Sequence, residues 1–212
     1  MEKAYVTILG DSYSTFAGCL PEGNYVYYPR EGIEDVKNAE DTWWRQLIKR
    51  RNLELLVNDS SSGTTVSTRV REQHKIEDAF INRMKHSLSS AGVNGKLPDL
   101  VLIFGATNDS WIDNEVGEVQ CGNWSEEDLK RVLPACCYLL DYVKSNNPDA
   151  QIAYIINCDL KEEIQQGIAD ACAHYDVLSI QLHDISKVMG HPDALGMRQI
   201  CDQVNAALDA AL

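Results

Sequence analysis

Four residues that can take part in chemistry stand at widely separated points of the chain, each in a turn after an apolar segment. They offer a hydroxyl (Ser12), a turn glycine (Gly63), a side-chain amide (Asn108) and an imidazole (His191). A hydroxyl becomes a nucleophile when a neighbouring base takes its proton. Each residue alone also has an ordinary structural interpretation, because Gly-Asp-Ser is a common turn with a helix-capping residue. A shared function therefore requires a fold that brings the four together.

The apolar pattern predicts strands that alternate with helices. Short apolar runs bounded by turn residues predict strands at 5–9, 53–57, 99–104, 151–156 and 177–180. Helical spacing of apolar residues, with start and stop signals, predicts helices at 43–52, 66–88, 125–145, 161–174 and 195–212. The segments 15–40 and 110–124 are expected to be irregular, and long irregular segments are often functional.

This alternation is typical of an α/β fold, a three-layer αβα sandwich in which helices cover both faces of a parallel sheet. A single domain is expected to span residues 1–212. By analogy with flavodoxin-like proteins, the five strands are expected in the order 2-1-3-4-5. Ser12, Gly63, Asn108 and His191 follow different strands, so all four fall at the carboxyl edge of the sheet, where such folds bind ligands.

The composition argues against several classes of partner. The chain has 19 Lys and Arg against 32 Asp and Glu, a formal net charge of −13. Neither nucleic acid nor an anionic membrane surface is therefore expected as a partner. Seven cysteines without Cys-x-x-Cys spacing do not suggest a metal site or a disulfide framework, and no metal or organic cofactor is predicted. This cysteine usage, without a signal-like or membrane-spanning apolar segment, predicts a cytoplasmic protein.

Four sequence blocks resemble those of the SGNH, or GDSL-type, hydrolases, and they occur in the same order. Residues 10–14 (GDSYS) are similar to the nucleophile block, and residues 62–65 (SGTT) to the glycine block. Residues 105–109 (GATND) are similar to the Gly-x-x-Asn-Asp block, and residues 191–197 to the histidine block. Together the blocks span nearly the whole chain. The resemblance implies a three-layer α/β fold and ester hydrolysis through an acyl-enzyme.

The resemblance also implies a role for each residue. Ser12 would be the nucleophile, and His191 would be the base that activates it and then the acid that protonates the leaving alcohol. The oxyanion hole would consist of the backbone N–H groups of Ser12 and Gly63 and the side-chain amide of Asn108. Gly63 suits this role because the absence of a Cβ lets a substrate approach the backbone closely.

One position departs from the family pattern. The family has an aspartate three residues before the histidine, where it orients the imidazole, but this chain has Val188 there. The nearest upstream acid is Asp184, seven residues before His191. Three alternatives follow: Asp184 reaches the ring by a different loop path, a backbone carbonyl replaces the acid and leaves a Ser–His dyad, or the protein is catalytically weak.

We therefore expect a serine esterase that acts on a small or medium carboxylic ester, with O-acetyl groups on carbohydrate as one case. Aromatic residues near the expected site, Tyr28 and Trp44, are candidates for the substrate-binding wall. One alternative is an ester- or glycan-binding protein on the same scaffold, with little or no catalysis. Another is an acyltransferase, in which an alcohol other than water accepts the acyl group. The sequence gives no signal for the oligomeric state.

Overall fold

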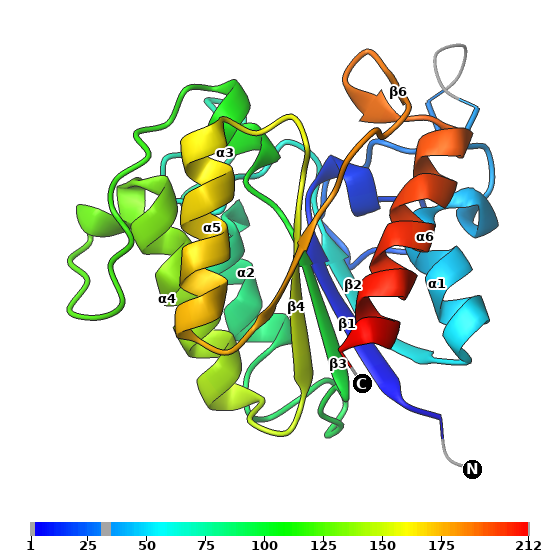
Figure 1. Cartoon of the computed structure of the whole chain (residues 1–212), viewed down its shortest axis with the longest axis horizontal. Helices are drawn as coiled ribbons and strands as arrows, with labels where there is room; N and C mark the ends of the chain where they lie inside the picture. The colour runs from blue at the N-terminus through cyan, green and yellow to red at the C-terminus, as the bar shows by residue number, and fades with distance from the viewer. Residues whose placement is uncertain (1–2, 31–34, 212) are drawn as a thin grey trace.

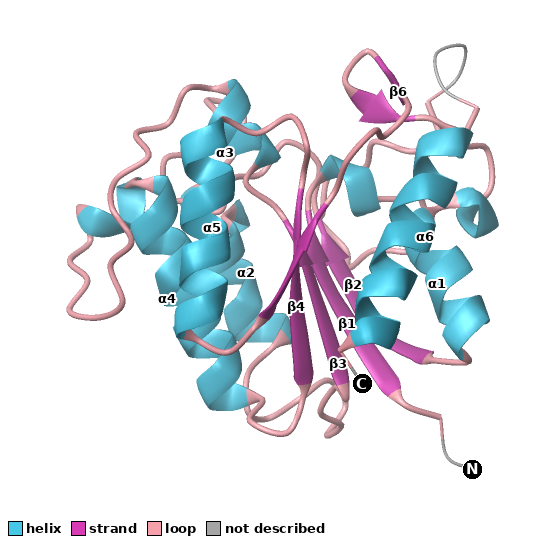
Figure 2. Cartoon of the chain, viewed as in Figure 1, coloured by secondary structure: helices cyan, strands magenta, loops and turns pink. Residues whose placement is uncertain are grey.

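A computed structural model of the chain describes residues 3–30 and 35–211, which form a five-stranded parallel sheet between two layers of helices (Figures 1 and 2). The strand order is β2-β1-β3-β4-β5, which confirms the order expected by analogy with flavodoxin-like proteins. The strands are β1 (Tyr5–Gly10), β2 (Glu54–Ser60), β3 (Leu100–Phe104), β4 (Gln151–Ile156) and β5 (Leu178–Gln181). β1, β3 and β4 are buried almost throughout, because helices cover both of their faces.

Two separate hydrophobic cores hold the helices against the sheet. On one face lie α1 (Trp43–Arg51) and α6 (Ala194–Ala210), and on the other lie α2 (Phe80–Ser87), α4 (Val132–Asn146) and α5 (Glu162–His174) (Figure 2). One core cluster joins α1 and α6 to the sheet, and the second joins α2, α4 and α5 to it. The sheet is therefore a rigid platform whose carboxyl edge stays open to loops.

Several short elements at that edge are absent from the sequence prediction. A 3-10 turn, η1 (Ser12–Ser14), follows β1, and the short helix α3 (Thr107–Trp111) follows β3. After β5 the chain forms a small antiparallel hairpin from β6 (Lys187–Val188) and β7 (His191–Pro192). Each of these elements holds a residue of the predicted site or lies next to one.

The helix predicted at 66–88 is much shorter in the structure. Only α2, from Phe80 to Ser87, is an α-helix, and residues 66–79 form turns with one 3-10 turn, η3 (Ile76–Asp78). Contacts across the fold hold this segment in another conformation: the buried Asp109 carboxylate accepts hydrogen bonds from the backbone N–H groups of Val66 and Ser67. The Arg69 carbonyl, which would accept a hydrogen bond from within a helix, accepts instead from the side-chain amide of Asn114.

The helix predicted from 125 is also interrupted. A 3-10 turn, η4 (Asp128–Lys130), comes first, and α4 begins at Val132 after the extended Arg131. Within residues 3–30 and 35–211, no helix is long and apolar enough to cross a membrane.

Candidate active site

Ser12 lies at the carboxyl end of β1, where the strand turns sharply into η1. The preceding Asp11 caps this turn, since its carboxylate accepts a hydrogen bond from the backbone N–H of Tyr13 at 3.1 Å. Gly10 has no space for a side chain, because a Cβ there would lie 2.6 Å from the Ser60 Oγ. The Ser12 side chain is almost fully buried but opens onto a cavity of about 340 Å³. The turn thus holds one hydroxyl at the edge of the sheet.

His191 reaches Ser12 from the β6–β7 hairpin. Its two-residue turn consists of Met189 (φ +49°) and Gly190 (φ +80°), both in the left-handed conformation that such tight hairpins need. The His191 Nε2 lies 3.0 Å from the Ser12 Oγ, and the Nδ1 lies 3.3 Å from the Met189 carbonyl oxygen. A carbonyl can only accept, so Nδ1 carries the ring proton. Nε2 is then the acceptor for the Ser12 hydroxyl.

Three contacts fix the hairpin on the sheet. The Tyr13 hydroxyl donates to the Gly190 carbonyl, and the Tyr28 hydroxyl donates to the Pro192 carbonyl at 2.6 Å. At the start of the hairpin, the Lys187 Nζ donates to the Asn157 Oδ1 at 2.8 Å and forms an ion pair with Asp159. The position of His191 is therefore set on both sides of the turn.

Aromatic rings enclose the imidazole. The Tyr27 ring stacks on the His191 ring with centroids 3.6 Å apart, and the Trp111 ring meets it edge-on at 5.5 Å. Burial lowers the pKa of His191 to about 4, and the positive charges of Arg30 and Lys187 act in the same direction. The imidazole is therefore neutral near neutral pH and able to accept a proton.

The other two predicted residues lie beside this pair. Gly63 has φ +80°, and a Cβ there would lie 2.5 Å from the His74 Nε2. The Asn108 Nδ2 donates one hydrogen to the Thr64 carbonyl at 3.0 Å, and the amide has a second hydrogen to donate. Asn108 and Gly63 both line the cavity that contains Ser12 and His191. The structure thus brings together all four residues that the sequence singled out.

The backbone donors at the site are open. Within the described part of the chain, the backbone N–H groups of Ser12 and Gly63 make no backbone hydrogen bond of their own. Together with the Asn108 amide, they are suited to bind an oxygen that becomes negatively charged.

The structure does not bring Asp184 to the imidazole. Its carboxylate is 98% exposed and lies 3.6 Å from the Nδ1 of the adjacent His183. The acceptor at the His191 Nδ1 is the Met189 carbonyl instead. Val188 pairs with His191 across the hairpin, so the family's aspartate position is occupied by an apolar cross-strand neighbour.

Replacing Asp184 with asparagine is expected to change kcat/KM on an ester by less than about twofold, since exposed charges away from special contacts have small effects. The measurement is steady-state hydrolysis of a short-chain ester by both forms. His183→Gln is the matched control at the neighbouring position. A fall of a hundredfold in the Asp184 variant alone would show that the carboxylate reaches the ring during turnover.

Two expected wall residues are corrected by the structure. Tyr28 and Trp44 are both fully buried in the core on the α1 and α6 side, and neither lines the cavity. Tyr27, adjacent to Tyr28 in the sequence, and Trp111 form the aromatic wall instead. The aromatic run at 25–28 indicated the right loop, but the path of that loop determines which ring faces the site.

Sequence reasoning missed a buried arginine that ties the loops of the site together. Arg83 on α2 donates to the Gly10 carbonyl at 3.0 Å and to the Thr64 hydroxyl at 3.2 Å. It also forms a buried ion pair with Asp59 at 3.0 Å. One guanidinium therefore links the end of β1, the end of β2 and the loop that contains Gly63. No local sequence signal marks it, because Arg83 follows the ordinary helical pattern of its segment.

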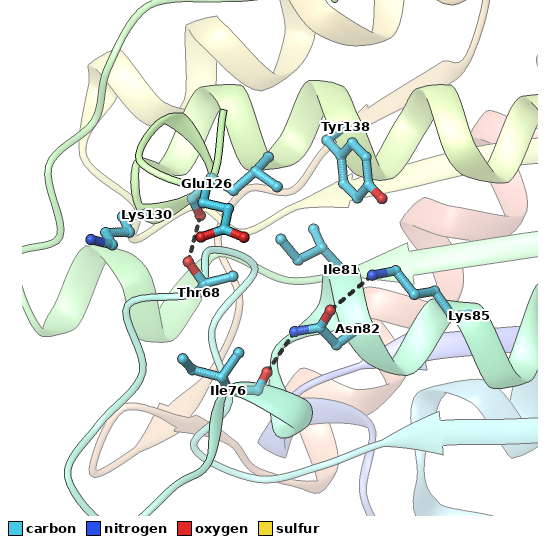
Figure 3. A pocket seen from close by; sticks show the side chains of 9 residues that line it. Thr68, Ile76, Ile81, Asn82, Lys85, Glu126, Lys130 and Tyr138 are labelled. Carbon is cyan, nitrogen blue, oxygen red and sulfur yellow. Dashed lines mark hydrogen bonds between the residues drawn. The ribbon is translucent and has the colours of Figure 1, made fainter. Parts of the chain in front are cut away.

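A separate cavity of about 380 Å³ lies away from this site, between α2, α4 and the segment that contains η4 (Figure 3). Ile81 and Tyr138 form its apolar part, and Lys85 hydrogen-bonds Asn82 at its rim. None of the four predicted site residues lines it.

The strand order and helical layers are those of the SGNH hydrolase fold. The model of the GDSL-like lipase/acylhydrolase family matches residues 4–208. The chain therefore belongs to that family and is a GDSL-type hydrolase.

Solved structures of similar proteins agree with this assignment. One, from Bacteroides uniformis and described as a GDSL-like lipase, is 39% identical, with a TM-score of 0.90 over 99% of this chain and 97% of its own. A second structure described as a GDSL-like lipase, from Bacteroides ovatus, is 38% identical, with a TM-score of 0.90 over 99% of this chain and 100% of its own.

A family two carbohydrate esterase from Clostridium thermocellum, solved in complex with cellohexaose, shares the fold. It is 14% identical, with a TM-score of 0.61 over 100% of this chain and 66% of its own. A comparison with curated protein sequences finds no match.

Proposed function

We propose that this protein hydrolyses carboxylic esters through an acyl-enzyme on Ser12, with His191 as the general base. The observation that supports this most directly is the 3.0 Å contact between the Ser12 Oγ and the His191 Nε2, with the Nδ1 directed to a carbonyl. The neutral imidazole takes the hydroxyl proton as the Oγ attacks the ester carbonyl carbon. The imidazolium then gives that proton to the leaving alcohol, and water completes the cycle by the same route.

The oxyanion of each tetrahedral intermediate is bound by the Ser12 and Gly63 backbone N–H groups and by the Asn108 amide. Removal of one such donor costs about 2.7–4 kcal/mol in a protease test case. The Arg71 guanidinium donates to the Asn108 Oδ1 at 3.3 Å and the Asn108 Nδ2 donates to the Thr64 carbonyl, so both ends of the amide are held. These donors are placed before the substrate arrives.

The Met189 carbonyl takes the place of the orienting carboxylate in this mechanism, so the catalytic unit is a Ser–His dyad. The carbonyl keeps the ring proton on Nδ1, which leaves Nε2 as the base. Unlike a carboxylate, it brings no negative charge to stabilise the imidazolium. A pKa of about 4 for His191 is consistent with the lack of a negative charge at its Nδ1.

A small acyl group is the substrate that this site favours. The cavity of about 340 Å³ is lined mainly by polar residues, with no long apolar channel for a fatty acyl chain among its described lining residues. A structural relative is a carbohydrate esterase. O-acetyl groups on carbohydrate therefore fit the proposal.

A fluorophosphonate probe tests the nucleophile directly. Incubation of the wild-type protein should attach one probe, and peptide mass spectrometry should locate it on Ser12. Ser62→Ala is the matched control, because Ser62 lines the same cavity without an imidazole partner, and that variant should still be labelled. A wild-type protein that resists labelling, or a label on another serine, would contradict the assignment. It would favour a binding function on this scaffold instead.

The acid limb of the pH profile of kcat/KM should lie at a lower pH than an ordinary histidine would give. His191 must be neutral to accept the proton, and its pKa is lowered to about 4 from the usual value of about 6.5. We expect kcat/KM to stay level from neutral pH down to about pH 5 and to fall about tenfold per unit below pH 4. Circular dichroism at each pH separates this loss from acid unfolding. An acid limb near pH 6.5 would show that the free enzyme's imidazole is solvated.

A further inference from the structure

The cavity at Ser12 has a charge opposite to that of the chain. The protein has 32 acidic residues against 19 Lys and Arg. Yet the described residues that line this cavity include two arginines, Arg30 and Arg71, and no aspartate or glutamate. A negatively charged protein repels anions in general, whereas this cavity locally attracts them. The proposed reaction develops negative charge at the oxyanion, on the Arg71 side of the cavity, but it gives no reason for a cation on the His191 side, where Arg30 lies.

Arg30 lies on the His191 side of the site. Its guanidinium carbon is 5.3 Å from the centre of the Tyr27 ring, the ring that stacks on the imidazole. Arg30 is exposed, and it forms no ion pair with a carboxylate of the described residues. Its guanidinium is therefore accessible from solvent.

Arg71 lies on the opposite side, next to the proposed oxyanion hole. One of its nitrogens donates to the Asn108 Oδ1, and its Nε is buried without a hydrogen-bond partner. It too has no carboxylate partner within residues 3–30 and 35–211. A half-buried cation without a counter-charge is costly, so a cation kept there suggests an anionic ligand.

We propose that the substrate is an anionic ester whose alcohol part carries a carboxylate or phosphate group, bound by Arg30 and attracted by the positive charge of Arg71. This inference rests on the proposed esterase function. His191 must protonate the leaving alcohol, so the alcohol lies on the His191 side of Ser12, where Arg30 is placed. A planar guanidinium binds carboxylate or phosphate oxygens through two parallel hydrogen bonds. Arg71 strengthens the positive field from the other side.

Three acetyl esters on one sugar skeleton test the proposal: acetylated galactose, acetylated galacturonic acid and acetylated galactose 6-phosphate. The measurement is kcat/KM from acetate release. At least one anionic ester should exceed the neutral one by roughly tenfold to a hundredfold, the range for charge-assisted hydrogen bonds. The better of the two anions distinguishes a carboxylate ligand from a phosphate. The preference should shrink as salt is added.

Variants then assign the preference to the arginines. Arg30→Gln and Arg71→Gln should each lower the ratio of anionic to neutral kcat/KM by about tenfold, and Arg30→Glu should reverse the preference. The ratio removes any effect of Arg71 on the Asn108 amide, because that effect is common to all three esters. Arg69→Gln is the matched control, since this exposed arginine is on the same loop but does not line the cavity.

Two results would overturn the proposal. One is a wild-type protein that hydrolyses the neutral ester as well as both anionic ones. The other is an Arg30→Gln variant that changes all three esters equally and moves the acid limb of the pH profile, because the guanidinium would then act only on the imidazole. Both results leave the esterase function intact. Failure of the esterase function itself looks different, since Ser12 would then not be labelled and none of the esters would be cleaved.

Discussion

Replacement of Ser12 by alanine is expected to lower kcat on a short-chain ester by about 10⁴–10⁶-fold. The hydroxyl is the only group that forms the acyl-enzyme in the proposed mechanism, and serine removal in a protease costs about 10⁶-fold. The residual rate would come from the oxyanion donors, which still polarise the ester carbonyl for direct attack by water. The measurement is kcat and KM for 4-nitrophenyl acetate, with KM changed little.

The same variant has a second, sharper readout. Residues that act as one unit are not additive, so the Ser12→Ala, His191→Ala double variant should be no slower than Ser12→Ala alone. Folding is not expected to suffer, because the described contact of the Ser12 hydroxyl is with His191. If the two substitutions instead lowered kcat by independent factors that multiply in the double variant, the dyad would be contradicted. A Ser12→Ala variant with a tenth or more of the wild-type activity would contradict the nucleophile.

Replacement of Arg83 by methionine is expected to destabilise the protein by about 3–5 kcal/mol, the cost of removing one partner of a buried ion pair. The buried Asp59 would keep a charge without its counter-ion, and the Gly10 carbonyl would lose a donor. For a chain of this size, that loss corresponds to a fall in Tm of roughly 6–20 °C. Urea denaturation measures the free energy of unfolding.

Arg50→Met is the matched control for this prediction. Arg50 forms an ion pair of similar length, 2.8 Å to Asp202, but both side chains are largely exposed. Its loss should cost less than about 1 kcal/mol. Asp59→Asn added to Arg83→Met should restore part of the stability, because it removes the orphaned charge. Equal costs for Arg83→Met and Arg50→Met would show that burial does not set the strength of the Arg83 pair.

The fold class was predictable because it depends on local patterns that repeat along the chain. Apolar runs such as Leu100–Phe104 alternate with amphipathic helices, which predicts a parallel sheet, whereas the strand order was expected only by analogy with flavodoxin-like proteins. The approximate location of the site was predictable for the same reason, since parallel strands end at one edge. Residues that follow different strands, such as Ser12 and Asn108, meet there without any contact in sequence.

What could not be predicted depends on contacts between distant segments. The helix expected at 66–79 is replaced by turns that bind distant side chains, such as the Asp109 carboxylate, which accepts hydrogen bonds from Val66 and Ser67 some forty residues away. Arg83 is indistinguishable in the sequence from a solvent-facing helix residue, although it is buried. The choice between Tyr27 and Tyr28 as a wall of the cavity depends on the loop path. Patterns within one segment do not contain this information.

The acceptor at the His191 Nδ1 belongs to the main chain, and this has a consequence for how the site can change over generations. A side-chain carboxylate can be lost by a single substitution, whereas the Met189 carbonyl is present whatever residue occupies that position. What must be preserved is the bend of the chain at Met189 and Gly190, both with positive φ. Substitutions that relax this bend would move the acceptor away from the Nδ1 and impair the imidazole as a base, although His191 itself is unchanged. In the proposed mechanism, retention of the dyad therefore depends on the backbone conformation at Met189 and Gly190, which a comparison of side chains alone does not reveal.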